Sequence, residues 1–264
     1  MIRARLENRY PSHQNAIELF EDRWLTRIEE VHPGLRSGPG RYLRYDRRPV
    51  RAANQLGFVA GSLHGMSVLE LGPMEGAHTY QLAKLGAGSV LAIEANTDAY
   101  LRCLVLKEIL EIPNSRFLLG DFVSFLKQNE TRFDLIFCSG VLYHMEDPFD
   151  LIQAMSRRTD RVFLWTHFFD PTDPKGPACQ PEAVRRESLD LTYYRHTYAD
   201  DVETGPFWGG IAPSPSWLWR DDIRRIFEHF GFTFELLEEN RNLDVGHHFT
   251  AVAIRGAEFN RSFS

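Results

Sequence analysis

The feature that most constrains this chain is the order of apolar and glycine-rich segments over residues 67–96, SVLELGPMEGAHTYQLAKLGAGSVLAIEAN. An apolar run of strand length is followed by a glycine turn, an amphipathic segment that ends at Gly86, and a second apolar run. This order predicts one βαβ unit, whose right-handed crossover brings the carboxyl ends of both strands to one edge of a parallel sheet. In open α/β sheets, ligands bind at that edge.

The glycine turn of this unit, GPMEG over residues 72–76, is suited to ligand binding. Gly72 and Gly76 remove side chains where the backbone turns sharply or approaches a ligand. The free N–H groups at the start of the following helix suit a carboxylate or a phosphate. Glu70 lies at the end of the first strand, where we expect it to point into the crevice. Glu94 ends the second strand, where an acid can bind both hydroxyls of a ribose.

Met74 stands where the dinucleotide pattern G-x-G-x-x-G needs its second glycine, so an NAD(P) site is disfavoured. The pattern E-x-G-x-x-x-G, followed by a ribose acid, instead resembles motif I of the class I S-adenosylmethionine (SAM) methyltransferases. An ordinary βα turn with two glycines is the alternative explanation of the segment by itself. Met74 and Glu75 depart from the small residues that the family often has there, and we expect them to tighten the carboxylate end of the site.

A second informative segment begins with the apolar run FDLIFCS over residues 133–139, as expected of a parallel strand covered on both faces. It continues into GVLYHMEDP, and the sequence SGVLYH followed by an acid and a proline resembles the segment after strand 4 of many SAM methyltransferases. It is especially similar to the tRNA wobble-uridine carboxymethyltransferase group. The resemblance implies that Gly140 lets the backbone approach the cofactor and that Tyr143 and His144 face the transferred methyl group. His144 is a candidate general base, and the alternative is that both side chains only pack the loop.

Two further strand ends are predicted at the same edge. A helix over residues 97–110, with Thr97 as its N-cap, precedes a short strand that ends at Asp121 and Phe122. The resemblance implies that Asp121 binds the adenine amino group and that Phe122 flanks the ring, whereas capping of the next helix is the alternative role of Asp121. The fifth strand, over residues 161–169, brings His167 to this edge as a second candidate for substrate contact or proton transfer. A hydrogen-bonded histidine at a strand end is its alternative.

The resemblance covers residues 55–255 and implies an α/β, Rossmann-like class I SAM methyltransferase fold. The predicted sheet has seven strands, mostly parallel, with an antiparallel last hairpin over residues 232–239 and 247–255. The residues that we predict to bind SAM are Glu70, Gly72, Pro73, Gly76, Glu94, Ala95, Asn96, Asp121, Phe122, Ser139, Gly140 and Val141. The chain is divided into a helical and basic lid segment (1–54), a SAM-binding core (55–169), a cap insertion (170–216), the C-terminal part of the core (217–256) and a tail (257–264).

The first and third of these segments lie outside the α/β alternation. A helical lead-in over residues 1–30 is followed by a basic run with six arginines and one acid between Arg36 and Arg51. This run is a solvated face, a lid over SAM, a clamp through Arg44 for an anionic group, or an RNA contact. The cap insertion is rich in proline and aromatic residues, which argues against disorder. We predict substrate contacts from His196, Trp208 and Trp217, with core packing as the alternative for Trp217.

Composition limits the classes of function. The net charge of −6 disfavours a globally basic nucleic-acid binder. The three cysteines form no C-x-x-C pair, and two of them lie in apolar runs, which indicates core thiols and a reducing, cytoplasmic location. The sequence has neither an apolar run long enough to span a membrane nor the apolar region of a signal peptide. It predicts no metal site.

The implied reaction is an in-line displacement at the sulfonium methyl group, for which the enzyme holds an acceptor atom in a dry pocket. We favour an oxygen acceptor on a small or sugar-like metabolite, because the cap is rich in aromatic residues and histidine. Three alternatives remain open. They are an enzyme that methylates or carboxymethylates RNA, a non-catalytic SAM-binding module, and an NAD(P) oxidoreductase.

Overall fold

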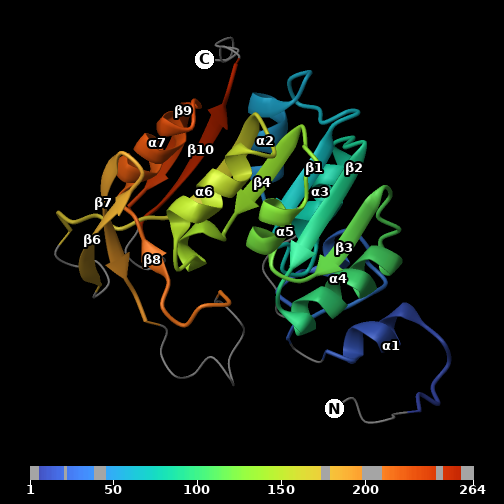
Figure 1. Cartoon of the computed structure of the whole chain (residues 1–264). Helices are drawn as coiled ribbons and strands as arrows, with labels where there is room; N and C mark the ends of the chain where they lie inside the picture. The colour runs from blue at the N-terminus through green and yellow to red at the C-terminus, as the bar shows by residue number, and fades with distance from the viewer. Residues whose placement is uncertain are drawn as a thin grey trace.

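The structure is a computed structural model that describes residues 6–20, 23–38, 46–173, 179–197, 210–241 and 246–256 (Figure 1). Arg44 and Trp208, two of the predicted substrate contacts, lie outside these ranges. None of the helices in the described ranges combines the length and the apolar character that crossing a bilayer requires.

A mixed sheet of seven strands forms the centre of the described chain, in the order β3-β2-β1-β4-β5-β10-β9. Its strands are β1 (Ser67–Leu71), β2 (Ser89–Glu94), β3 (Ser115–Leu119), β4 (Leu135–Ser139), β5 (Arg161–His167), β9 (Thr233–Asn240) and β10 (His248–Ile254). The first five strands are parallel, whereas β10 is antiparallel to both β5 and β9. This confirms the predicted Rossmann-like fold and its antiparallel last hairpin.

Helices cover both faces of the sheet. The helices that pack on one face are α2 (Arg48–Leu56), α3 (Ala77–Lys84) and α4 (Thr97–Ile109), and those on the other are α5 (Phe122–Gln128), α6 (Pro148–Ser156) and α7 (Arg220–His229). On the α2 face the rings of Phe137 and Phe163 stack with centroids 4.9 Å apart, and neither ring is exposed. Burial on both faces explains why the parallel strands are almost continuously apolar.

Helix α2 was not predicted, because its sequence RPVRAANQL lies within the basic run. Pro49 occupies the first turn, where a missing N–H is tolerated. Ala52, Ala53 and Leu56 then form a narrow buried stripe against the sheet, with the arginines outside it. The helix brings the second half of the basic run to the carboxyl edge of the sheet.

The helical part of the N-terminal lead-in is shorter than predicted. It consists of α1 (His13–Glu18) and a 3₁₀ turn, η2 (Ile28–Glu30). Ile17, Trp24 and Ile28 are buried against α4, whereas Leu19 is 62% exposed. The predicted N-cap of α4, Thr97, is wrong by one residue, because the side chain of Asn96 accepts the hydrogen bond from Ala99 N at 2.8 Å.

The insertion after β5 contains strands that the sequence analysis missed. Strands β6 (Gln180–Arg186) and β7 (Leu189–Arg195) form an antiparallel hairpin, and β8 (Ser216–Trp217) pairs with β7. Most β6 side chains are exposed, so no apolar alternation marked this strand. Figure 1 shows the small sheet beside α7 and away from the β3 edge, where α1 lies next to α4.

The small sheet is tied to the segment that follows β4. Tyr193 is fully buried, and its hydroxyl donates to Asp147 Oδ1 at 2.6 Å. Arg186 donates to the other oxygen of the same carboxylate. Ser216 N donates to Met145 O at 2.8 Å. The insertion is therefore packed against the loop that carries Tyr143 and His144.

We expect Tyr193→Phe to lower the free energy of unfolding by about 1–2 kcal/mol, because it removes a buried hydrogen bond to a carboxylate. Chemical denaturation at neutral pH measures this change. Tyr10→Phe is the matched control, since Tyr10 is 90% exposed. Equal stabilities of the two variants would contradict the docking role of Tyr193.

Candidate active site

The structure brings the predicted cofactor residues to one edge of the sheet. They follow the carboxyl ends of β1, β2, β3 and β4, which are neighbours in the sheet. The order of strands reverses between β1 and β4, and such a reversal opens the crevice where ligands bind in doubly wound sheets. The loop over residues 72–76, named here the donor loop, lies at that point.

The donor loop requires glycine at two positions. Gly72 has φ +62°, and a Cβ atom there would lie 2.6 Å from Val141 Cγ1. Gly76 has φ +85°, and its Cβ would lie 3.1 Å from Phe117 Cζ. Both the left-handed backbone and the close approach exclude a side chain. Pro73 closes the turn by accepting a hydrogen bond from Gly76 N at 2.9 Å.

Glu94 holds the donor loop from the end of β2. Its Oε2 accepts from Met74 N at 2.9 Å, and its Oε1 accepts from Asn96 N, also at 2.9 Å. Met74 has φ +57°, a left-handed conformation that is uncommon for a long side chain. The carboxylate is 6% exposed, and burial raises its pKa. Glu94 thus shapes the loop, while its contact with a ribose stays a prediction, as do those of Ala95 and Asn96.

Glu70 lies beneath α3 rather than open to the crevice. Its side chain is 1% exposed and accepts a hydrogen bond from the Thr79 hydroxyl. Burial raises its pKa to about 8, so the protonated form predominates at pH 7. Its Oε1 has no hydrogen-bond partner in the described part of the chain, and His78 Nδ1 lies 3.9 Å away. An unpartnered buried carboxyl oxygen has capacity for a polar group of a ligand.

The residues after β3 and β4 lie on the same edge. Asp121 caps α5, because its carboxylate accepts from Val123 N and Ser124 N at 3.0 Å each. The capping role is therefore present, and contact of Asp121 and Phe122 with adenine stays a prediction. Gly140 has φ +85° and donates its N–H to Trp165 O at 2.9 Å. Ser139 accepts a hydrogen bond from Arg48 NH1 at 3.0 Å.

Arg48 belongs to a charged network that the sequence analysis missed. Its guanidinium lies 4.9 Å from the ring centroid of Trp165 and pairs with Asp46. Asp46 Oδ2 in turn lies 2.9 Å from His78 Nε2 on α3. Asp46 is the single acid in the basic run. Its position beside Arg47 and Arg48 was the sequence signal from which an ion pair could have been predicted. The network links the start of α2 to the donor loop side of the crevice.

A cluster of seven partly exposed rings lies beside Ser139 and Gly140. We name it the aromatic cluster, and its members are Tyr143, His144, Trp165, His167, His196, Trp217 and His248. Tyr143 lies at its centre, with ring centroids 4.1 Å from His144 and 4.6 Å from His167. His167 stacks on Trp217 at 5.5 Å and 14°. Five of the predicted catalytic and substrate residues are thus brought together.

Trp165 and His248 were missed, although strand register explains them. Trp165 precedes His167 by two residues on β5, so both side chains lie on one face of the sheet. His248 lies directly opposite His167 in the antiparallel pair of β5 and β10, with ring centroids 5.7 Å apart. The register depends on a pairing between distant segments, which local sequence does not encode.

Burial sets the protonation of the cluster. It lowers the pKa of His144 to about 4, with help from the neighbouring His167 and His196, and it lowers that of His167 to about 4. Both imidazoles are therefore neutral at pH 7. Burial raises the pKa of Tyr143 to about 12, so its hydroxyl keeps its proton. In the described ranges no group of His, Cys, Asp and Glu side chains has the arrangement of a metal site.

The tautomer of His167 follows from one contact. Its Nδ1 lies 3.1 Å from His247 O. A carbonyl oxygen only accepts hydrogen bonds, so Nδ1 carries the hydrogen and Nε2 presents a lone pair. A neutral imidazole with a fixed basic nitrogen is the arrangement that a general base needs.

Comparison with known proteins agrees with this geometry. A family described as "Methyltransferase domain" matches residues 62–165. The tRNA U34 carboxymethyltransferases of Campylobacter hominis and Methylococcus capsulatus are each 31% identical to the chain, over 114 and 133 residues. These matches cover 42% and 47% of this chain and 39% of each relative. The chain therefore matches well under half the length of these curated relatives.

Two solved structures share the fold. The N-terminal domain of EvdMO1 with SAH bound is 22% identical, has a TM-score of 0.70, and covers 93% of this chain and 100% of that domain. Magnesium protoporphyrin IX methyltransferase (ChlM) from Synechocystis PCC 6803, with bound SAH, is 20% identical with a TM-score of 0.50, over 74% and 77% of the two chains.

The glycine loop at the strand reversal and the seven-stranded sheet are those of the class I SAM-dependent methyltransferase fold. The methyltransferase-domain match over residues 62–165 agrees with the resemblance that the sequence predicted. SAM is the cofactor of the class, and the site suits it. A side chain at Gly72 would meet Val141, so only glycine permits this close turn, and the unpartnered oxygen of Glu70 lies beneath α3 at the end of the same strand.

We expect Gly72→Ala to weaken SAM binding about tenfold or more, because it combines backbone strain with a contact against Val141. Calorimetric titration with S-adenosylhomocysteine measures the affinity. Gly65→Ala is the matched control, since Gly65 has φ +75° but no atom within 4 Å of its Cβ position.

The control should lose stability without losing affinity. Adding Val141→Ala to Gly72→Ala should restore part of the affinity, because it removes the side-chain contact and leaves only the strain. Wild-type affinity of Gly72→Ala would contradict the placement of the donor at this loop.

Proposed function

We propose that this protein transfers a methyl group from SAM to a hydroxyl group of a small, sugar-like molecule. The observation that carries this proposal is the tautomer of His167. Its imidazole is neutral, with the hydrogen on Nδ1, which donates to His247 O, and a lone pair on Nε2. It lies in a ring cluster next to Ser139 and Gly140, at the edge where the class binds its donor. A hydroxyl acceptor needs such a base, because it must lose a proton during transfer.

The chain's own residues divide the work between binding and proton transfer. When bound, SAM supplies an electrophilic methyl group on a positively charged sulfur. The donor loop and Glu94 would orient it, and the face of Tyr143 would stabilise the positive charge. The insertion is fixed to the loop after β4 through Asp147 and Ser216, so it can exclude water from the reacting atoms.

Proton transfer would follow bond formation closely. The acceptor oxygen becomes strongly acidic as its bond to the methyl carbon forms, so a weakly basic imidazole is sufficient. Nε2 of His167 would take the proton while Nδ1 keeps its bond to His247 O, which stabilises the imidazolium. His144, whose pKa is equally low, is the second candidate for this role.

The character of the aromatic cluster supports a sugar-like acceptor. Stacked rings with a few fixed polar groups are typical of sites for small organic ligands. The family match ends at residue 165, before the segment that contains His196 and Trp217. The fold shared with the N-terminal domain of EvdMO1 extends over 93% of the chain, and that domain was also solved in the presence of SAH and D-fucose.

The second candidate is transfer of a methyl or carboxymethyl group to tRNA. It is supported by the tRNA U34 carboxymethyltransferases that match the donor half. Two arginines of the basic run argue against it, because Arg48 and Arg51 are paired with Asp46 and Glu238. The net charge of −6 also gives no general attraction to phosphate.

A panel of acceptors with methyl-labelled SAM tests the proposal. Labelled product from free sugars, and none from tRNA, is the expected result. Label in tRNA, with binding that weakens steeply with salt, would replace the proposal by the second candidate. Binding of S-adenosylhomocysteine without any turnover would favour a non-catalytic module. Binding of a nicotinamide nucleotide without SAM would favour an oxidoreductase.

We expect His167→Asn to lower kcat by roughly a hundredfold while the affinity for SAM stays unchanged. In the wild type, kcat should fall only as the pH drops through about 4, because protonation removes the lone pair of Nε2. A rate profile between pH 3.5 and 8 measures this dependence. His64→Asn, an exposed histidine outside the cluster, is the control. An unchanged kcat in His167→Asn would leave His167 a packing residue and move the test to His144→Asn.

A further inference from the structure

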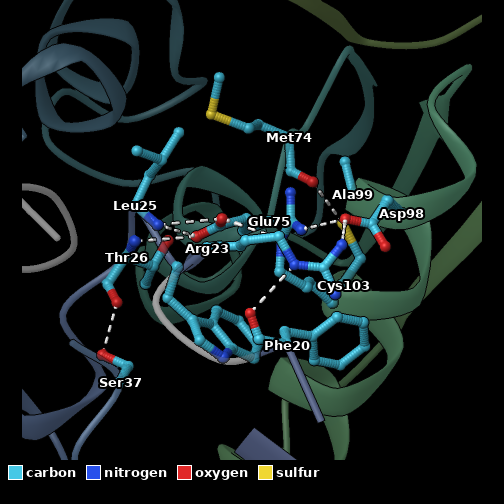
Figure 2. Close-up of polar contacts among 12 residues, drawn as sticks. Phe20, Arg23, Leu25, Thr26, Ser37, Met74, Glu75, Asp98, Ala99 and Cys103 are labelled. Atoms are coloured by element: carbon cyan, nitrogen blue, oxygen red, sulfur yellow. Dashed lines mark hydrogen bonds and ion pairs between the residues drawn. The ribbon is translucent and has the colours of Figure 1, made fainter. Parts of the chain in front are cut away.

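Glu75, in the donor loop, directs its carboxylate toward the backbone of Leu25 and Thr26 in the N-terminal segment (Figure 2). The side chain is 1% exposed. Its oxygens accept from Leu25 N at 3.0 Å and from Thr26 N at 2.8 Å. Arg102 on α4 completes the contact, with Nε 3.0 Å from Glu75 Oε1. A loop residue of the donor site is therefore bonded to backbone about fifty positions earlier in the chain.

A second ion pair links the same parts. Arg102 NH1 lies 2.7 Å from Asp98 Oδ2, and Arg23 NH1 lies 2.8 Å from the same oxygen. Asp98 thus joins the N-terminal segment to the start of α4, and Figure 2 shows it on the far side of the contact from Leu25 and Thr26. Because Asp98 and Arg23 are about half exposed, this outer pair contributes less than the buried contacts of Glu75.

The N-terminal segment over residues 23–38 is itself firmly packed. Ser37 Oγ donates to Thr26 O at 2.7 Å and accepts from Ile28 N at 3.0 Å. Trp24 and Ile28 are buried against α4. The backbone N–H groups of Leu25 and Thr26, which donate to Glu75, are therefore held in place by the packing of their own segment.

The donor loop needs such support because its backbone is strained. Met74 adopts a left-handed conformation, which persists only when the surroundings fix it. Glu94 accepts from Met74 N, and the Cys103 thiol donates to Met74 O at 3.4 Å. The next residue is Glu75, so three separate segments hold two consecutive residues of the loop.

We propose that Glu75 is a positioning residue, through which residues 23–38 hold the donor loop in the conformation that binds SAM. This inference rests on the proposed function, because it assumes that the loop binds the donor. Glu75 stands where the family often has a small residue. Its carboxylate joins the donor loop to the N-terminal segment through hydrogen bonds to Leu25 N and Thr26 N. A pre-formed loop loses less conformational freedom when its ligand binds, so affinity is the property that Glu75 sets.

Glu75→Ala should raise both the Kd for S-adenosylhomocysteine and the KM for SAM about tenfold. At saturating SAM, kcat and the acceptor KM should change less than about twofold, because Glu75 does not contact the reacting atoms. Glu75→Gln keeps one acceptor oxygen and should give an intermediate Kd, which also serves if the alanine variant fails to fold. Calorimetry and steady-state kinetics are performed well below the unfolding temperature of each variant.

Asp134→Ala is the matched control. Asp134 directly precedes β4 and also accepts from a backbone N–H, that of Ser67 at 2.8 Å. Ser67 begins β1, so this contact lies at the opposite end of the strand from the donor loop. The control variant should lower the unfolding temperature and leave the Kd unchanged. Wild-type Kd values in both Glu75 variants, or an equal rise in Asp134→Ala, would overturn the positioning role alone. Failure of the wild type to bind S-adenosylhomocysteine would instead overturn the donor assignment and this inference with it.

Discussion

Strand β1 hydrogen-bonds to β2 on one side and to β4 on the other, and this pairing brings the donor loop beside the segment that follows β4. The chain must leave β3 at one edge and return to β4 beside β1, which creates the reversal of strand order. The donor loop follows β1, and the segment with Tyr143 and His144 follows β4. Two segments about seventy residues apart are therefore neighbours because of backbone pairing alone.

The parts of the fold that were predicted are those that local sequence determines. Buried parallel strands need continuous apolar runs, and these marked β1, β2, β4 and β5. Glycine at residues 72 and 76 marked the donor loop, since a left-handed backbone and a close approach admit no other residue. Such requirements act within a few positions of each residue, so a single sequence displays them.

The parts that were missed depend on contacts between distant segments. Helix α2 has only a narrow apolar stripe, and its role became visible through packing on β4 and β5. Strand β6 is mostly exposed and is fixed by pairing with β7. His248 joins the aromatic cluster through its register with His167. Glu75 was missed as well, because its partners are the backbone N–H groups of Leu25 and Thr26, about fifty residues earlier. The motif did not reveal that Glu94 accepts a backbone hydrogen bond from the donor loop, whereas capping of α5 by Asp121 was one of its two predicted roles.

Burial leaves the acceptor side of the site with little charge, and this bears on the acceptor. His144 and His167 are held neutral, and the charge of Arg48 is balanced by Asp46. Aromatic faces in such surroundings favour the cationic sulfonium of the donor. An anionic acceptor would find no unbalanced cation among these described groups, whereas a neutral hydroxyl needs only a lone pair to take its proton. The electrostatics therefore support an uncharged acceptor over a phosphate-rich one.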